Sequence, residues 1–197
     1  QFESSNFTFL FAPAYNPAIA HVQPVRKSLG VSTLFNTMGP LLSPARPEFQ
    51  IMGIAKPSMG PIIAETMKEL GRSRALVVHG AGTDEIAVHG ETEVWELRDG
   101  EITNFRISPA ELGVSTHALE DLRGGDGAEN ARFMRATFAG QGPAAHRDAV
   151  AVNAGAMFYL AGISNTMREG TERALSMLTD GSVETWQRTH EEADYRD

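Results

Sequence analysis

A strand, a helix and a second strand are predicted in direct succession between residues 49 and 78. Segments 49–55 and 75–78 are short and apolar, as buried strands are. Between them, helical spacing relates Met59, Ile62, Ile63, Met67 and Leu70. Such a unit closes as a right-handed crossover between parallel strands. It places the following loop, residues 79–85, at the carboxyl edge of the sheet, where α/β folds bind ligands.

The rest of the chain adds a hairpin and several helices to this unit. Asp99-Gly100 between apolar segments is a strong hairpin signal. Asp126 and Glu129 have the spacing of a capping box that opens a helix, and residues 147–193 read as three further helices. The fold class is therefore α/β, with a mixed, mostly parallel sheet flanked by helices.

The N-terminal quarter has a different pattern. Residues 7–12 are aromatic and apolar and end at Pro13, which predicts a buried strand. A helix follows, with apolar positions at helical spacing up to Gly30. Pro44 and Pro47 then mark a hinge.

Composition excludes several classes of partner and chemistry. The formal net charge of −8 argues against binding nucleic acid or an anionic membrane, since both need clustered Lys and Arg. With no cysteine, thiolate catalysis and Cys-ligated zinc are excluded, and a reducing cytoplasm is expected. The longest apolar stretch, 149–163, is interrupted by Asn153 and is too short to span a bilayer.

Arg26 is the most informative single residue. It shares one helical stripe with Ile19, Val22 and Leu29. A guanidinium at the edge of an apolar stripe needs a partner, and a planar carboxylate matches its fork of donors. A ligand carboxylate, an internal salt bridge and a side chain that extends to solvent all remain open at this point.

Asp84 and Glu85 are the candidate metal ligands. They follow a buried strand and a glycine-containing loop. Adjacent carboxylates at such an edge can hold Mg²⁺ and leave its other positions to water and substrate phosphates. Acidic loop residues also occur for solubility alone.

Two other features are weaker. Residues 124–127 resemble a glycine-rich phosphate-binding loop at the start of a helix. No basic residue or Ser/Thr follows at the spacing of a nucleotide-binding loop. Asp126 is therefore interpreted as the N-cap of the helix. The six histidines are scattered without metal-ligand spacing and are expected to be structural or solvated. No nucleophile with a base beside it is visible, so no catalytic residue is predicted.

A set of segments, taken in order, resembles anthranilate phosphoribosyltransferase. The specific block is PVRKSLG at 24–30 with TLFNTMGPL at 33–41. The other matching segments are FLFAPAYNPA at 9–18, ALVVHG at 75–80, TDEI at 83–86, DGEI at 99–102 and ENA at 129–131.

The resemblance implies the nucleoside phosphorylase/phosphoribosyltransferase type of fold. Residues 1–15 would supply a strand and the edge of the α/β domain. Residues 16–47 would form the hinge and helices of a small helical domain near the N-terminus, and 48–197 the α/β domain. The family's glycine-rich GTGGD loop does not occur in the sequence, so we expect a C-terminal portion of such an enzyme that is inactive alone.

The resemblance also implies site residues and substrates. Arg26 would engage the carboxylate of anthranilate, and Asp84 with Glu85 would hold Mg²⁺ against phosphoribosyl pyrophosphate. Four further residues would belong to the anthranilate site: Ala12, Pro13, Asn16 and Gly39. The implied reaction is attack of the anthranilate amine on the ribose anomeric carbon as pyrophosphate leaves, a step of tryptophan biosynthesis in a cytoplasmic homodimer.

One departure from the family pattern keeps other readings open. Asn16 stands where the family usually has histidine, and an amide cannot carry charge. The alternatives are an inactive or differently specific relative of the same fold, a pyrimidine nucleoside phosphorylase, or a non-catalytic relative that binds nucleic acid or a protein. A nucleoside phosphorylase would need another base-binding segment in place of PVRKSLG, and a nucleic-acid binder would need a basic face.

Overall fold

The computed structural model describes residues 2–10, 15 and 39–194. The chain divides into two compact units between Pro47 and Glu48. In the first unit, a short helix α1 (Phe2–Ser5) precedes residues 7–10, which form neither helix nor strand.

The strand expected over residues 7–12 is therefore wrong for the four of them that are described. The Ser5 hydroxyl donates to the Phe7 carbonyl (2.9 Å) and accepts from its N–H (3.2 Å), occupying the backbone groups that a strand would use for pairing. Phe7 and Phe9 are mostly exposed, so the aromatic run is not a buried strand in this unit.

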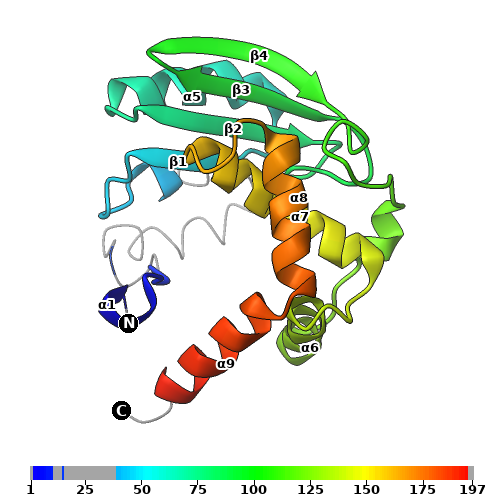
Figure 1. The fold of residues 1–197 in the computed structure, drawn as a ribbon. Coiled ribbons are helices and arrows are strands. Elements are labelled where there is room, and N and C mark those ends of the chain that lie inside the picture. Colours follow the sequence, from blue (N-terminus) through cyan, green and yellow to red (C-terminus); the bar gives the residue numbers. More distant parts are fainter. Residues whose placement is uncertain (1, 11–14, 16–38, 195–197) are drawn as a thin grey trace, which may run out of the picture. The chain divides into compact units, whose positions relative to one another are not determined.

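The second unit is built on a four-stranded sheet in the order β1-β2-β3-β4 (Figure 1). Its strands are β1 (Phe49–Gly53), β2 (Arg74–Gly80), β3 (Thr92–Arg98) and β4 (Glu101–Ile107). β1 pairs with β2 in parallel, while the β2–β3 and β3–β4 pairs are antiparallel. The mixed sheet is confirmed, but among the described strands only one of these pairings is parallel, so "mostly parallel" does not describe it.

The two strands, the helix between them and the hairpin form where local patterns predict them. The expected apolar face of the helix is only partly correct, because Ile63 and Met67 are buried while Ile62 and Leu70 are exposed. β1 and β2 are joined through the short 3₁₀ helix η1 (Pro57–Met59) and helix α5 (Gly60–Glu69). Asp99 and Gly100 both have positive φ (52° and 79°), as the two central residues of a type I′ hairpin turn require. Glycine or a short polar residue is favoured there because a β-carbon clashes with the backbone at positive φ.

The remaining described elements are helical: η2 (Leu119–Leu122), α6 (Gly127–Phe138), α7 (Ala144–Leu160), α8 (Met167–Thr179) and α9 (Ser182–Asp194). The Asp126 carboxylate accepts from the Glu129 N–H (2.9 Å), which confirms it as the N-cap of α6. The last three helices match the three expected over residues 147–193.

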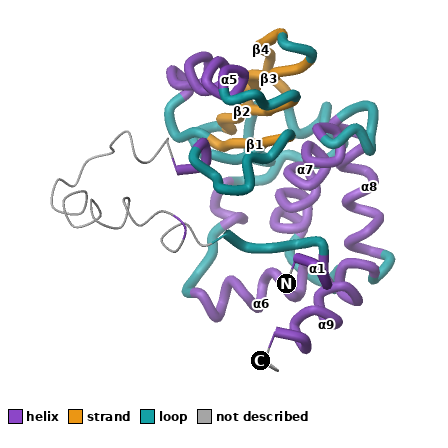
Figure 2. Tube along the Cα trace, turned by 90° about the vertical axis from the view of Figure 1, so that its left-hand side faces the viewer, coloured by secondary structure: helices purple, strands orange, loops and turns teal. Residues whose placement is uncertain are grey.

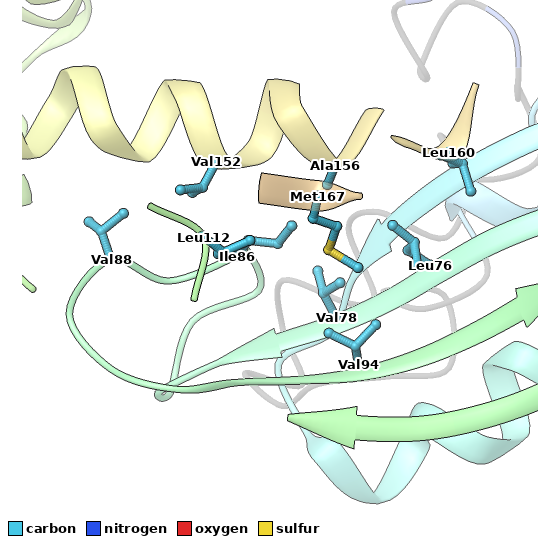
Figure 3. Packing of buried hydrophobic residues seen from close by; sticks show 10 residues of the cluster. All are labelled: Leu76, Val78, Ile86, Val88, Val94, Leu112, Val152, Ala156, Leu160 and Met167. Atoms are coloured by element: carbon cyan, nitrogen blue, oxygen red, sulfur yellow. The ribbon is translucent and has the colours of Figure 1, made fainter. Parts of the chain in front are cut away.

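Helices cover both faces of the sheet (Figures 1 and 2). On one face α5 packs against β2 and β3, and the Trp95 ring lies so close to Gly60 that a β-carbon there would be 2.3 Å from it. On the other face, residues of β2 and β3 meet α7 and α8 in a buried apolar cluster (Figure 3). Its members are Leu76, Val78, Ile86, Val88, Val94, Leu112, Val152, Ala156, Leu160 and Met167.

Tyr159 joins α7 to the sheet through a polar contact. Its hydroxyl donates to the buried Glu96 carboxylate (2.7 Å) and accepts from Arg98 (3.3 Å). The Arg74 guanidinium stacks on its ring, 5.1 Å from the centroid. Burial, followed by the bond to Glu96, raises the pKa of the Tyr159 phenol.

Replacement Tyr159→Phe is expected to lower the free energy of unfolding by about 1 kcal/mol at pH 7, because it leaves the Glu96 carboxylate without its donor. A raised folded-state pKa means that the neutral phenol is favoured by folding. This contribution is complete below the unfolded pKa, about 10, and is lost as pH rises through the folded value. Urea unfolding from pH 7 to 10.5 measures the difference, with exposed Tyr15→Phe as the control. Equal midpoints for Tyr159→Phe and the wild type at pH 7 would contradict the assignment.

No helix among residues 2–10, 15 and 39–194 combines the length and apolar character needed to cross a membrane.

Candidate functional site

The acidic pair lies where the sequence predicts, at the carboxyl edge of the parallel strands. β1 and β2 end at Gly53 and Gly80, and the loop carrying Asp84 and Glu85 begins directly after β2. Both acidic residues are exposed. Neither carboxylate forms a hydrogen bond or ion pair with another described residue, so both are free to bind a ligand.

The backbone before the pair is closed into a tight turn. Gly80 and Thr83 exchange two backbone hydrogen bonds (3.0 and 2.8 Å), and the Thr83 hydroxyl also donates to the Gly80 carbonyl (2.7 Å). Ala81 inside this turn has a positive φ of 47°. These contacts fix the direction in which the chain enters the acidic pair.

The loop also lies directly over the end of β1. A β-carbon built on Gly53 would be 1.5 Å from the Asp84 carbonyl oxygen. A β-carbon on Gly80 would be 2.3 Å from the Glu85 carbonyl oxygen. Glycine is therefore required at both strand ends for the acidic loop to approach the sheet this closely.

Beyond the pair, the chain is held by the side chain of Asn153 from α7. Its Oδ1 accepts from the Ile86 N–H (3.1 Å), and its Nδ2 donates to the Ile86 carbonyl (3.1 Å). Sequence reasoning noted Asn153 only as an interruption in an apolar stretch. The signal was present, because a polar amide in an apolar helix must find partners.

A hollow of about 370 Å³ opens at the same end of β2. It is lined by Pro57, His79, Ala81, Glu91, Glu93 and Arg106. His79 is held in place by a 2.8 Å bond between its Nδ1 and the Ile54 carbonyl. Asp84 and Glu85 are not among the lining residues, so this hollow is separate from the acidic pair.

The described histidines have structural partners, as expected. His117 lies 2.8 Å from the buried Asp148 carboxylate, which Arg147 also contacts at 2.8 Å. The backbone N–H of His117 donates to the Val88 carbonyl and so connects the segment around His117 to the end of the acidic loop. His146 packs edge-on against Phe133.

The glycine segment before α6 is held by the side chain of Asn130. The Gly125 N–H donates to the Asn130 Oδ1, and the Asn130 Nδ2 donates to the Gly125 carbonyl. These contacts agree with a structural role for residues 124–127.

The residues expected to contact the aromatic substrate are largely outside the described part of the chain. Arg26, Asn16, Ala12 and Pro13 all lie there. Gly39 is described, is half-buried, and has no atom within 4 Å of where a β-carbon would stand. Their assignment to a substrate site stays a prediction.

The acidic pair fits a Mg²⁺ site of the kind that substrate phosphates complete. Two free, exposed carboxylates are hard oxygen ligands on a fixed loop. In residues 2–10, 15 and 39–194 no group of three or more His, Asp or Glu side chains is placed to hold a metal ion. This arrangement suits Mg²⁺, which keeps several waters and binds through one or two carboxylates plus phosphate oxygens.

The fold and the site geometry together define an α/β protein with an acidic loop at the carboxyl edge of its βαβ unit. A family model described as "Glycosyl transferase family, a/b domain" matches residues 1–184. The chain belongs to this family.

Relatives in the family share most of the sequence. The chain is 67% identical over 195 residues to the anthranilate phosphoribosyltransferase of Corynebacterium diphtheriae, covering 99% of this chain and 57% of that protein. It is 69% identical over 196 residues to the enzyme of Corynebacterium efficiens, again 99% and 57%. The chain thus spans a little over half the length of these relatives. The resemblance inferred from the motifs is confirmed.

Solved structures agree in fold. The anthranilate phosphoribosyltransferase of Thermus thermophilus superimposes with a TM-score of 0.87 at 40% identity, covering 95% of this chain and 55% of that one. The Saccharomyces cerevisiae enzyme in complex with PRPP and Mg gives 0.75 at 26% identity, covering 85% and 49%. The same enzyme in complex with 4-fluoroanthranilate gives 0.82 at 27%, covering 91% and 52%.

Proposed function

We propose that the protein to which these residues belong transfers the phosphoribosyl group of phosphoribosyl pyrophosphate to the amine of anthranilate, releasing pyrophosphate. The observation that carries the proposal is the free acidic pair, Asp84 and Glu85, on a fixed loop at the carboxyl edge of β1 and β2. Sequence identity of 67% with a named anthranilate phosphoribosyltransferase supports the choice of reaction.

In this reaction, Asp84 and Glu85 would hold Mg²⁺ on the pyrophosphate side of the donor. The metal would supply Lewis-acid stabilisation of the negative charge on the leaving pyrophosphate. The turn at Gly80 and Thr83 and the approach at Gly53 keep the carboxylates at the strand edge before the donor arrives. Such preorganisation lowers the barrier by positioning and needs no protein nucleophile.

Arg26 is assigned to the acceptor substrate. Its guanidinium would pair with the anthranilate carboxylate through two parallel hydrogen bonds and so orient the amine. Ala12, Pro13, Asn16 and Gly39 would line the approach of the aromatic ring. Residues 16–47 would form the hinge and helices of the small domain, and 48–197 the α/β domain. A cytoplasmic location and a homodimer stay predictions of the resemblance.

The proposal is tested with the intact protein, incubated with anthranilate, phosphoribosyl pyrophosphate and Mg²⁺. Formation of phosphoribosylanthranilate, followed by the loss of anthranilate fluorescence, is the expected result. No turnover under these conditions would favour the inactive relative that Asn16 keeps open. Phosphorolysis of a pyrimidine nucleoside instead would favour the nucleoside phosphorylase.

Replacement Arg26→Ala in the intact protein is expected to raise KM for anthranilate by about 10- to 100-fold, since one charged hydrogen-bonding partner is worth roughly 1.5–3 kcal/mol. KM for phosphoribosyl pyrophosphate should change little. The neighbouring cation provides the control, because Lys27→Ala removes the same charge from the next position of the segment. Equal effects on both substrates would remove Arg26 from the acceptor site.

A further inference from the structure

Asn153 makes three hydrogen bonds with a single amide side chain. Two of them join its Oδ1 and Nδ2 to the N–H and carbonyl of Ile86, both at 3.1 Å. The third runs from Nδ2 to the Ala149 carbonyl one turn earlier in α7, at 2.9 Å. The bond to Ala149 fixes the amide relative to α7. Because the amide is fixed, its two bonds to Ile86 hold the loop in a set position relative to this helix.

Ile86 is the residue that directly follows the acidic pair. With its N–H and carbonyl both bound, its backbone is held much as in a β-pair. Its side chain is 1% exposed and lies in the core with Val152 and Ala156 of α7, the helix that also carries Asn153 (Figure 3). Ile86 is thus anchored to α7 through both backbone and side chain.

The backbone is therefore fixed on both sides of the acidic pair. Before the pair, Thr83 is hydrogen-bonded to Gly80, and the Asp84 carbonyl lies over Gly53. After the pair, Ile86 is hydrogen-bonded to Asn153. Asp84 and Glu85 lie between these anchors with their carboxylates exposed.

We propose that Asn153 is a positioning residue for the metal-binding carboxylates of Asp84 and Glu85. It does not touch the metal or the substrate; it fixes the backbone from which the two ligands extend. The inference rests on the proposed function, because the pair must bind Mg²⁺ for its position to matter. Partners that orient metal ligands from outside the coordination shell typically change metal affinity or activity by about 10- to 100-fold when removed.

The test is equilibrium binding of Mn²⁺ to the intact protein, measured by electron paramagnetic resonance of the free ion. Asn153→Ala is expected to weaken Mn²⁺ binding by about tenfold or more. It should also raise KM for phosphoribosyl pyrophosphate while leaving KM for anthranilate unchanged, and speed hydrogen exchange at the Ile86 amide. The near-isosteric Asn153→Asp should likewise weaken binding, since an ionised carboxylate cannot donate to the Ile86 carbonyl.

A matched control separates positioning from general stability. Asn104 also uses its side-chain Nδ2 to bind a backbone carbonyl, that of Val94, at 3.0 Å within the β3–β4 hairpin. Asn104→Ala should lower the unfolding midpoint but leave Mn²⁺ affinity and both KM values as in the wild type. Loss of Mn²⁺ affinity in both alanine variants to the same degree would reduce the role of Asn153 to stability and overturn the proposal.

Failure of the inference and failure of the proposed function give different results. If Asn153→Ala and Asn153→Asp bind Mn²⁺ like the wild type while Asp84→Asn with Glu85→Gln does not, the metal site stands and Asn153 has no positioning role. If the acidic double variant also binds normally, the metal assignment itself is wrong and the inference falls with it. Should Asn153→Ala not fold, Asn153→Asp alone decides between these results.

Discussion

Replacing Asp84 and Glu85 together by Asn and Gln in the intact protein is expected to lower kcat/KM for phosphoribosyl pyrophosphate by about 100- to 1,000-fold. The amides keep the size of the side chains but remove both negative charges from the metal site. Lewis-acid stabilisation of a leaving pyrophosphate is worth several kcal/mol, and about 1.4 kcal/mol corresponds to a tenfold rate. Activity measured against Mg²⁺ concentration should show the loss as a higher metal requirement.

A control carboxylate is available at the far end of the sheet. Glu101 is exposed at the start of β4, where the register places it opposite Arg98 and therefore away from the carboxyl ends of β1 and β2. Glu101→Gln changes the net charge without touching the acidic loop, and activity should be unchanged. If the activity of the double variant at positions 84 and 85 depends on Mg²⁺ concentration as that of the wild type does, the two carboxylates are only solvated surface groups.

Local sequence patterns were sufficient for the elements that lie close together along the chain. The apolar runs and the helical spacing between them predict β1, α5 and β2. Spacing does not settle the whole buried face of α5, since Ile63 and Met67 are buried but Ile62 and Leu70 are exposed. Asp99-Gly100 predicts the hairpin because few residues tolerate two successive positive φ values. Asp126 predicts the start of α6 because its carboxylate can reach an N–H three residues on.

Contacts between distant segments were beyond such patterns. Asn153 lies 67 residues from Ile86, and nothing in either segment alone indicates that they meet. The aromatic run at 7–10 shows the opposite failure. Its composition favours a strand, yet the neighbouring Ser5 binds the Phe7 backbone, and a strand needs partners that composition cannot supply.

The site was predictable where it depends on local connectivity along the chain, and unpredictable where it depends on contacts between distant segments. Asp84 and Glu85 follow a strand, so their position at its carboxyl edge comes from connectivity. The glycines at 53 and 80 were not recognised, because their role is the close approach of a loop from elsewhere in the chain. Arg26 and its neighbours rest on the family resemblance and on the substitution experiment described above.

Replacement Gly155→Ala is expected to lower the free energy of unfolding by about 1–2 kcal/mol, because α7 and α8 cross with their backbones in contact. A β-carbon on Gly155 would be 2.4 Å from the Thr171 N atom, and one on Gly170 would be 2.2 Å from the Gly155 carbonyl oxygen. Alanine gains about 1 kcal/mol over glycine in a helix interior. Overpacking against backbone costs typically about 1–3 kcal/mol and sometimes more, and here neither helix can relieve it by turning a side chain, so the clash outweighs the gain.

The same substitution should also disturb the acidic loop, since Gly155 is two residues from Asn153 and between Val152 and Ala156 of the apolar cluster. Moving α7 away from α8 shifts the amide that binds Ile86. Urea unfolding measures the stability loss, with Gly127→Ala as the control, because a β-carbon at Gly127 in α6 meets nothing within 4 Å and should be tolerated. A Gly155→Ala protein as stable as the wild type would mean that α7 and α8 can separate at little cost. The two helices would then be too loosely coupled for α7 to position the loop.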